Sequence, residues 1–216
     1  MEIGVLDVDA DDPVVIHPLR PTVWEWPEGI YARRTLHEEV TVRLRNVEPG
    51  DLDIYVRMRC DPVMMAELGG PLPREGIEAK VLSDVEATAS GRTWVLMIQP
   101  DQDDPATVAG SVVLWSHAEH AEHAEPISEI GWMVLPEFQG RGLGKAAVHA
   151  LLQRARHEDC WGIVHAFPGV TNAPSNGMCR TLGFTLIGEQ DVDFSDRPLR
   201  TNHWRIDPRT DLPVAP

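Results

Sequence analysis

The stretch that decides the fold is Leu135-Pro136-Glu137-Phe138-Gln139-Gly140-Arg141-Gly142-Leu143-Gly144-Lys145. It follows a strand-like segment and precedes an amphipathic helix pattern, and three glycines fall in the turn between them. A turn of this composition directs successive backbone N–H groups into one small space, at the positive end of a helix dipole. The stretch therefore predicts a binding site for phosphate oxygens.

Two common phosphate-binding loops do not fit this stretch. A nucleotide P-loop, G-x-x-x-x-G-K-[ST], would need its first glycine at Gln139 and its hydroxyl at Ala146. A dinucleotide-binding fingerprint, G-x-G-x-x-G, would begin at Gly140 and Gly142 but requires glycine where Lys145 stands. We therefore expect neither a P-loop nor a Rossmann site.

The pattern that fits is Q-x-x-G-x-G, from Gln139 to Gly144. It resembles the acyl-CoA-binding loop of the GNAT superfamily of N-acyltransferases. A second block, Asn172-Ala173-Pro174-Ser175-Asn176-Gly177-Met178-Cys179-Arg180-Thr181-Leu182-Gly183-Phe184, is similar to the superfamily's N-x-x-S…L-G-F segment. The resemblance covers about residues 40–207, and the early part (44–70) is similar to the branch that contains ribosomal-protein N-terminal acetyltransferases.

The resemblance implies a way of holding acetyl-CoA. Backbone amides of the glycine loop would bind the pyrophosphate, with added charge from Arg141 and Lys145. The strand edge at 133–135 would pair with the pantetheine arm as an additional strand, and Asn172 would anchor the pantetheine or the strand splay, or simply cap the turn. The cofactor-binding residues implied in this way are Met133, Val134, Leu135, Gln139, Gly140, Arg141, Gly142, Leu143, Gly144, Lys145 and Asn172.

Glu129 is the candidate general base. It matches the Glu of the Glu-Ile-Gly-aromatic pattern in the same branch, and a base on this strand would lie near the acetyl group. The alternative is a structural role, in which Glu129 hydrogen-bonds nearby groups or meets an arginine. Ser128 points to the opposite face of the strand and is the second candidate.

Ser175 is the candidate general acid. Many family members carry a tyrosine seven residues after the motif asparagine, where it protonates the departing thiolate, but this chain has Cys179 there. Ser175 follows Asn172 by three residues and matches the serine of the named branch. Its alternative role is a hydrogen bond at the helix N-terminus.

Composition excludes several classes of partner. Nineteen basic and 34 acidic residues give a formal net charge of −15, which disfavours nucleic acid. Three cysteines without metal-ligand spacing are typical of reduced thiols in a cytosol. The first twelve residues lack a signal-peptide pattern, and no apolar run approaches the length of a membrane span. We expect a cytoplasmic protein that does not bind a membrane.

The histidine-rich segment 117–123 is the one candidate metal site. His117, His120 and His123 are spaced by three, with Glu119 and Glu122 between them. Such spacing drifts off one face of a helix and alternates faces on a strand. The segment is therefore interpreted as a solvated hairpin tip, and no metal site is predicted.

The chain divides into an N-terminal arm (1–38), a GNAT acetyltransferase domain (39–208) and a C-terminal tail (209–216). The order of predicted elements is β-α-α-β-β-β-α-β-α-β-β, which is the GNAT order. The predicted fold is α/β (α+β), with a mixed, mostly antiparallel central sheet, flanking helices and a splay near the acyl-CoA site. The predicted ranges are strands at 40–45, 93–99, 107–115, 127–135, 161–167, 184–194 and 200–207, and helices at 48–60, 74–89, 143–156 and 173–182.

The function predicted from these features is N-acetyl transfer from acetyl-CoA to a primary amine, on a protein or peptide N-terminus or on a small molecule. The acceptor pocket is expected between the first helices (Tyr55, Met58, Met64, Met65) and the loop 193–200. Trp115 and Trp132 are interpreted as core residues. The alternative function is a non-catalytic acyl-CoA-binding module or sensor. Pairing of two chains through the late strands or the arm would give a homodimer.

Overall fold

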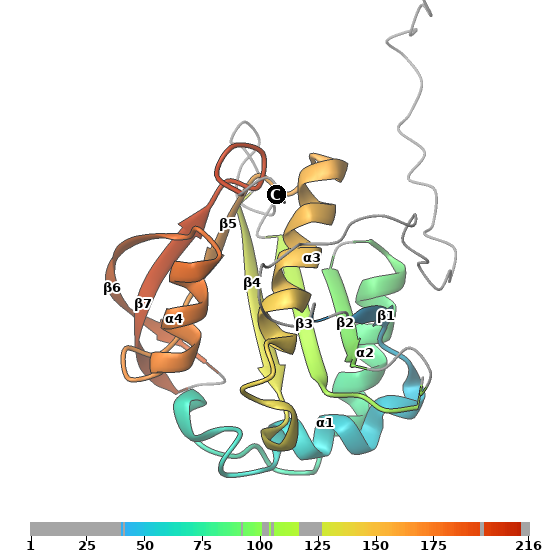
Figure 1. Cartoon of the computed structure of the whole chain (residues 1–216). Coiled ribbons are helices and arrows are strands. Elements are labelled where there is room, and N and C mark those ends of the chain that lie inside the picture. The colour runs from blue at the N-terminus through green and yellow to red at the C-terminus, as the bar shows by residue number, and fades with distance from the viewer. Residues whose placement is uncertain are drawn as a thin grey trace, which may run out of the picture.

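The computed structural model describes residues 40, 42–91, 93–100, 104, 106–116, 127–194 and 197–212. These residues form one seven-stranded sheet with helices on both faces (Figure 1). The predicted N-terminal arm and the histidine segment 117–123 lie outside the described residues.

The elements follow one another in the predicted order. They are β1 (Arg43–Asn46), η1 (Pro49–Asp51), α1 (Leu52–Arg59), η2 (Ala66–Leu68), α2 (Ile77–Ala89), β2 (Thr93–Gln99), β3 (Gly110–Ser116), β4 (Ile127–Val134), η4 (Pro136–Phe138), α3 (Leu143–Glu158), β5 (Ile163–Ala166), α4 (Ala173–Thr181), β6 (Thr185–Asp193) and β7 (Pro198–Ile206). The predicted strand at 93–99 has the observed bounds. The strands predicted at 107–115 and 161–167 are shorter at their starts, because ladder pairing begins only at Gly110 and Ile163.

The sheet is mostly antiparallel and open, in the order β1-β2-β3-β4-β5-β7-β6. The parallel pair is β4 with β5, and its ladder has three residue pairs that end at Glu129 and His165. β4 continues to Val134 while remaining paired with β3. Beyond Glu129, therefore, one edge of β4 faces a gap in the sheet, which is the predicted splay.

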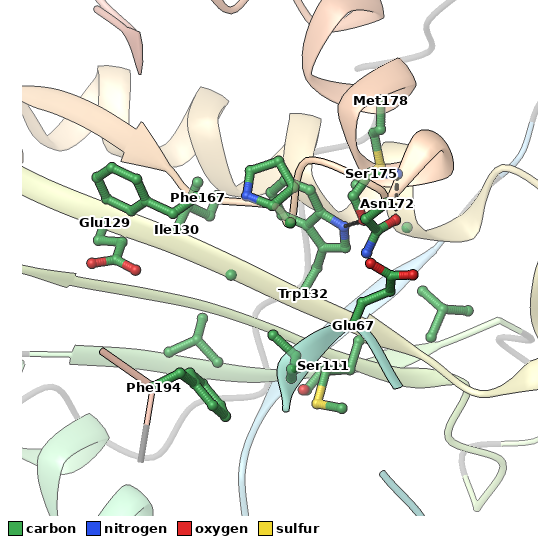
Figure 2. Close-up of a pocket in the computed structure, with 18 of the residues that line it drawn as sticks. Glu67, Ser111, Glu129, Ile130, Trp132, Phe167, Asn172, Ser175, Met178 and Phe194 are labelled. Carbon is green, nitrogen blue, oxygen red and sulfur yellow. Dashed lines mark hydrogen bonds between the residues drawn. The ribbon is translucent and has the colours of Figure 1, made fainter. Parts of the chain in front are cut away.

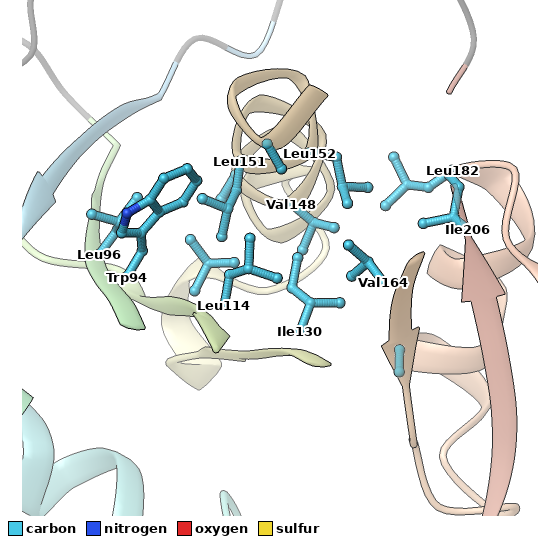
Figure 3. Packing of buried hydrophobic residues seen from close by; sticks show 14 of the residues in the cluster. Trp94, Leu96, Leu114, Ile130, Val148, Leu151, Leu152, Val164, Leu182 and Ile206 are labelled. Carbon is cyan, nitrogen blue, oxygen red and sulfur yellow. The ribbon is translucent and has the colours of Figure 1, made fainter. Parts of the chain in front are cut away.

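One face of the sheet is covered by α3 and α4. The buried side chains of α3 recur at helical spacing, as the sequence pattern predicts for a helix with one apolar face. Val148 and Leu151 pack over Leu114, Ile130 and Val164 in the main core (Figure 3). The remaining buried residues of α3 are Leu143, Ala147, Leu152 and Ala155.

The opposite face is covered by α1 and α2, and here the predicted acceptor pocket needs correction. Tyr55 and Met58 are each 1% exposed and belong to a second core, and Met65 is fully buried. Tyr55 donates a hydrogen bond to Asp84 (2.8 Å), and burial raises the pKa of its phenol. Of the four predicted residues, Met64 lines the cleft.

Asn176 ties α4 to the late strands. Its Nδ2 donates to the carbonyls of Gly169 and Asn172, each at 2.8 Å. Its Oδ1 accepts from Asn202 Nδ2 at 2.8 Å and from Trp204 Nε1 at 2.9 Å. A buried amide that satisfies all these groups fixes the start of α4, which bears Ser175, against β7.

The chain beyond β7 also belongs to the fold. Leu212 lies in the predicted C-terminal tail, but it is 3% exposed and packs in the main core. Because burial of a leucine contributes about 2 kcal/mol, this contact holds residues 209–212 on the domain.

Candidate active site

A cavity of about 2310 Å³ opens at the splay between β4 and β5. Its walls come from the cleft-facing residues of β4, the glycine loop, the start of α4 and the α1–α2 connection. Figure 2 shows Glu129 and Phe167 at one end of this cleft and Asn172, Ser175 and Glu67 toward the other. The cavity therefore joins the predicted phosphate loop to the predicted catalytic residues.

The glycine loop has the backbone geometry that an anion site requires. Gly140 and Gly142 have φ of +72° and +80°, in the left-handed region that disfavours any side chain. α3 begins directly after Gly142, no side chain caps it, and no acidic residue lies in its first turn. The first N–H groups of α3 thus lack intrahelical partners and point toward the cleft end at the positive pole of the helix.

Gly144 sets how closely α3 approaches β4. A Cβ added at Gly144 would lie 3.1 Å from Cγ2 of Val134, which is tighter than an ordinary contact. Gln139 donates from Nε2 to the carbonyl of Val134 (2.8 Å) and so fixes the end of β4. The three residues bring the strand edge and the helix N-terminus into one corner of the cavity.

The remaining predicted loop residues divide between cleft and core. Arg141 and Lys145 are exposed, and the Arg141 guanidinium lies over Phe138, 5.6 Å from the ring centroid. Leu143 is buried in the main core, so it can offer a ligand only its backbone. Leu135 is also buried, and its N–H donates to Ala109 O (2.8 Å). Its carbonyl accepts from the N–H of Phe138 (2.9 Å), so both backbone groups of Leu135 are already used within the protein.

Glu129 lies on the cleft face of the sheet. The register forms a continuous row across four strands, in which Trp115, Glu129, His165 and Arg205 are successive partners. Trp115 and Trp132 both line the cavity, although the sequence interpretation assigned them to the core. Trp132 is partly buried and also packs against the main core, as predicted, whereas Trp115 lies between its strand partners Thr93 and Glu129 and is half-buried.

Ser128 faces the other way, as predicted from strand alternation. It is fully buried, and its hydroxyl donates to the carbonyl of Trp161 (2.6 Å). That hydrogen bond holds the end of the α3–β5 connection against β4. Ser128 therefore has a structural role and offers no alternative to Glu129.

Ser175 and Asn172 meet at the N-terminus of α4. The Asn172 side chain accepts from the backbone N–H of Ser175 (3.1 Å), which is an N-cap. The Ser175 hydroxyl accepts from Nε1 of Trp132 (3.3 Å), and this bond crosses the splay (Figure 2). Because a serine hydroxyl accepts and donates at once, its own hydrogen stays available to a group in the cleft.

Cys179, at the position of the family's tyrosine, does not reach the cleft. Its side chain is fully buried in the main core, and burial raises the pKa of the thiol to about 12. A buried, neutral thiol on the far side of α4 cannot protonate a leaving group. On this helix, the residues that line the cavity are Pro174, Ser175, Met178 and Thr181.

Two contacts that the sequence did not reveal bridge the mouth of the cleft. Glu67 accepts a hydrogen bond from the Thr171 hydroxyl (2.6 Å). Arg197 donates from Nη1 to the carbonyls of Gly69 and Gly70, both at 2.6 Å. The α1–α2 connection is thereby joined to the β5–α4 and β6–β7 loops, which are more than 100 residues away in the chain.

The described residues contain neither a cluster of metal ligands nor a helix that could span a membrane. Within the described part of the chain, no three His, Cys, Asp or Glu residues gather closely enough to hold a metal ion. None of the helices described is both long and apolar enough to cross a bilayer.

A mostly antiparallel sheet that opens beside a glycine turn and an uncapped helix N-terminus is the architecture that the resemblance to the GNAT superfamily predicts. Sequence comparison agrees with this resemblance. The family model described as "Acetyltransferase (GNAT) domain" matches residues 41–185. The chain belongs to the GNAT acetyltransferase family. None of the curated proteins compared with the chain matches it.

Solved structures share the fold at low identity. RimL, a ribosomal L7/L12 α-N-protein acetyltransferase, is 18% identical with a TM-score of 0.63, over 82% of this chain and 99% of that chain. The microcin C7 self-immunity acetyltransferase MccE, solved with acetyl-CoA and AMP, is 17% identical with a TM-score of 0.62, over 77% and 92%. The putative acetyltransferase yncA from Salmonella typhimurium, solved with acetyl-CoA, is 18% identical with a TM-score of 0.62, over 81% and 98%.

Proposed function

We propose that this protein is an N-acetyltransferase that transfers the acetyl group of acetyl-CoA to a primary amine. The observation that carries the proposal is the continuous cleft from the glycine loop, along the unpaired edge of β4, to Glu129. The loop amides and Lys145 would hold the pyrophosphate. The edge at Met133 and Val134 would hold the pantetheine arm as an additional strand.

Glu129 and Ser175 would act on the reacting groups from opposite sides. Ser175 meets Trp132, which lies three residues beyond Glu129 and so about 10 Å further along the strand. Residues an odd number apart on a strand point to opposite faces. A thioester in the splay, where β5 no longer pairs, is accessible from both faces, and the separation leaves room for an amine and a thioester.

The reaction then follows from these positions. Glu129 takes a proton from the amine as its nitrogen bonds to the carbonyl carbon, and the C–S bond breaks. Ser175 donates its hydroxyl proton to the departing sulfur and regains one from solvent. Backbone N–H groups near the end of β4 would stabilise the carbonyl oxygen, as in other acyl transfers.

The charge of the cleft suits a cationic acceptor. Glu67, Glu129 and Asp193 line the cavity with Arg59 and Lys145, and the other two charged residues of the lining, Lys80 and Asp84, pair with each other. The excess of carboxylates attracts a protonated amine before it loses its proton. Among the structural neighbours, RimL acts on the N-terminus of a ribosomal protein and SpeG is a spermidine N-acetyltransferase. A peptide with a free N-terminal serine and spermidine are therefore the first acceptors to test.

A non-catalytic acyl-CoA-binding module is the second candidate. The burial of Cys179 favours it, because the position that carries the family's tyrosine supplies no acid here. Binding of acetyl-CoA without transfer to any amine in a broad panel would support this candidate and contradict the enzyme.

The first test is thermal stabilisation by acetyl-CoA, CoA, ATP and NAD. A ligand that binds only the native state raises its melting temperature, and we expect a rise with both CoA species and none with ATP or NAD.

Lys145→Glu should weaken acetyl-CoA binding about tenfold, or about 1.4 kcal/mol, because it reverses a charge beside the proposed phosphate site. Arg74→Glu, an exposed charge reversal outside the glycine loop, is the matched control. Gly142→Asp should abolish binding.

An absence of stabilisation by either CoA species at millimolar concentration would contradict the assignment of the loop. Wild-type affinity in Gly142→Asp would contradict it as well, because that change places a carboxylate and a Cβ where phosphate must approach.

A further inference from the structure

Two histidines that the mechanism above does not use lie in the same cleft. His165 Nδ1 and His203 Nε2 are 2.6 Å apart, and their ring centroids are 4.9 Å apart. The Phe167 ring lies against both, with its centroid 6.3 Å from that of His165 and 4.8 Å from that of His203. All three side chains line the cavity that contains Glu129.

The sheet register places this pair beside Glu129. His165 is the partner of Glu129 in the last β4–β5 pair, and paired residues lie about 4.8 Å apart with side chains on one face. His165 also pairs with Arg205, and His203 lies two residues earlier on β7, hence on the same face. A carboxylate and two imidazoles therefore follow one another on the cleft face of the sheet.

The short contact defines how the two rings can be protonated. One of the facing nitrogens must carry hydrogen and the other must accept it, so the pair holds at most one positive charge in this geometry. Burial, and then the charge of Arg205, lower the pKa of His203. A neutral imidazole takes a proton on one nitrogen and releases one from the other.

Charged groups face the pair from several elements. Glu129 on β4 favours an imidazolium, and Arg205 on β7 disfavours it. Glu67 on η2 and Asp193 on β6 line the same cavity and add negative potential. Other charged residues in its lining are Arg59, Lys80, Asp84 and Lys145. The carboxylates favour a proton on the pair, and Arg205 disfavours one on His203.

Stability does not account for the pair. β5 and β7 are already joined through Val164 with Ile206 and Ala166 with Trp204. A hydrogen bond between side chains contributes only about 1 kcal/mol net, and two apolar residues of the same shape would serve as well.

We propose that His165 and His203 form a proton relay that serves Glu129, an inference that rests on the proposed amine acetylation. The proton leaves the amine nitrogen for Glu129 and passes to Nε2 of His165. The Nδ1 proton of His165 moves to Nε2 of His203, and the Nδ1 proton of His203 goes to solvent. Each step forms one bond to hydrogen and breaks one, and exchange with water restores the starting tautomers.

The test uses variants that keep the hydrogen bond but cannot relay. In His165→Asn the amide lies near the position of His165 Nδ1, and in His203→Gln the amide lies near the position of His203 Nε2. Neither amide side chain has a second ring nitrogen that could pass a proton on. His165→Asn and His203→Gln should each lower kcat/KM for spermidine and for the N-terminal serine peptide about 10- to 100-fold near pH 7. The loss should shrink above about pH 9, where more amine is already neutral.

The control is His149→Gln. His149 is half-buried on α3, contacts Gln153 at 3.4 Å and lies outside the cleft lining, so its loss should leave the pH profile unchanged. Stabilisation by acetyl-CoA should be the same in all three variants.

Imidazole ¹⁵N spectra provide a second measurement. In these spectra His165 and His203 should titrate as a coupled pair, and His203→Gln should shift the titration of His165.

The outcomes separate the relay from the function on which it rests. Wild-type pH profiles in both His165→Asn and His203→Gln would overturn the relay alone. A loss that is equal at every pH would also overturn it, because it would indicate a structural role. No transfer by the wild-type protein to either acceptor would contradict the proposed function, and the relay with it.

Discussion

Glu129 and Ser175 differ in how their surroundings prepare them for chemistry. Glu129 lies in a row of paired residues between Trp115 and His165, so its position is set by the sheet. Ser175 lies on the first turn of α4, where Asn172 holds its backbone and Trp132 its hydroxyl. Both residues line the cleft, and fixed positions of this kind are what the proposed reaction requires of a base and an acid.

Glu129→Gln should lower kcat/KM for acetyl transfer about 10²- to 10⁴-fold, the range that a general base contributes. The rise of rate with pH should flatten, because the amide cannot accept the amine proton. Acetyl-CoA binding, measured by thermal stabilisation, should be retained. Glu86→Gln, an exposed change on α2, is the matched control, and an unchanged pH profile in Glu129→Gln would exclude this residue as the base.

Ser175→Ala should lower kcat about 10²-fold, the lower end of the range for a general acid, while the melting temperature changes little. The reason is that the helix cap uses the backbone N–H of Ser175, which alanine retains. Asn172→Ala provides the contrast, because it removes the cap and should cost about 1 kcal/mol of stability. Wild-type kcat in Ser175→Ala would leave the serine with a structural role only.

The element that forms the cleft wall, β4, depends on its contact with β3. The ladder between them runs from Gly110–Val134 to Ser116–Ser128, so β4 stays extended to its end although β5 has separated from it. At Gly110 the two backbones approach so closely that an added Cβ would lie 2.0 Å from the Met133 carbonyl oxygen. The absence of a side chain at Gly110 thus lets Met133 and Val134 keep their place in the cleft.

Gly110→Ala should destabilise the fold by about 1–3 kcal/mol or more, which lowers the melting temperature by roughly 2–12 °C in a domain of this size. Acetyl-CoA affinity should fall too, because the displaced strand edge is the proposed pantetheine site. Gly188→Ala, in β6 with no atom within 4 Å of the added Cβ, is the control. Equal melting temperatures for the two variants would show that the β3–β4 approach tolerates a side chain.

At the scale of the whole molecule, the cleft is closed by loops from distant parts of the chain. Arg197 binds the carbonyls of Gly69 and Gly70 and donates from Nη2 to Pro71 at 3.3 Å. A planar guanidinium carries five N–H donors in a rigid fork, so Arg197 can donate to these three carbonyls at once. The β6–β7 loop therefore holds the α1–α2 connection in place beside the part of the cavity where we propose that the amine binds.

Arg197→Gln should release this closure. Amide hydrogen exchange around residues 69–72 should accelerate roughly tenfold, which corresponds to about 1.4 kcal/mol, and KM for the amine should rise while acetyl-CoA affinity stays constant. Arg74→Gln, in the same connection but exposed, is the control. Unaltered exchange and KM would indicate that the α1–α2 connection holds its position without Arg197.

The local sequence predicted the order and type of the helices and strands, because strand alternation and helical spacing depend on neighbouring residues only. The glycine loop could also be predicted from the sequence, because Gly140 and Gly142 have φ angles of +72° and +80°, which strongly favour glycine. Tyr55 and Met58 were assigned to the wrong environment for a physical reason. Apolar residues of a helix look alike in sequence whether they face a core or a cleft, and the packing of α2 decides between the two.

The sequence by itself determined the family, the glycine loop, the strand that carries Glu129 and the helix start that carries Ser175, because each is encoded within about a dozen neighbouring residues. Tertiary structure alone decided which groups meet across the cleft. The pairing of Glu129 with His165, the contact of His165 with His203 and the hold of Arg197 on the α1–α2 connection join residues 36 to 128 positions apart. Their juxtaposition comes from sheet register and loop closure, which no local pattern specifies.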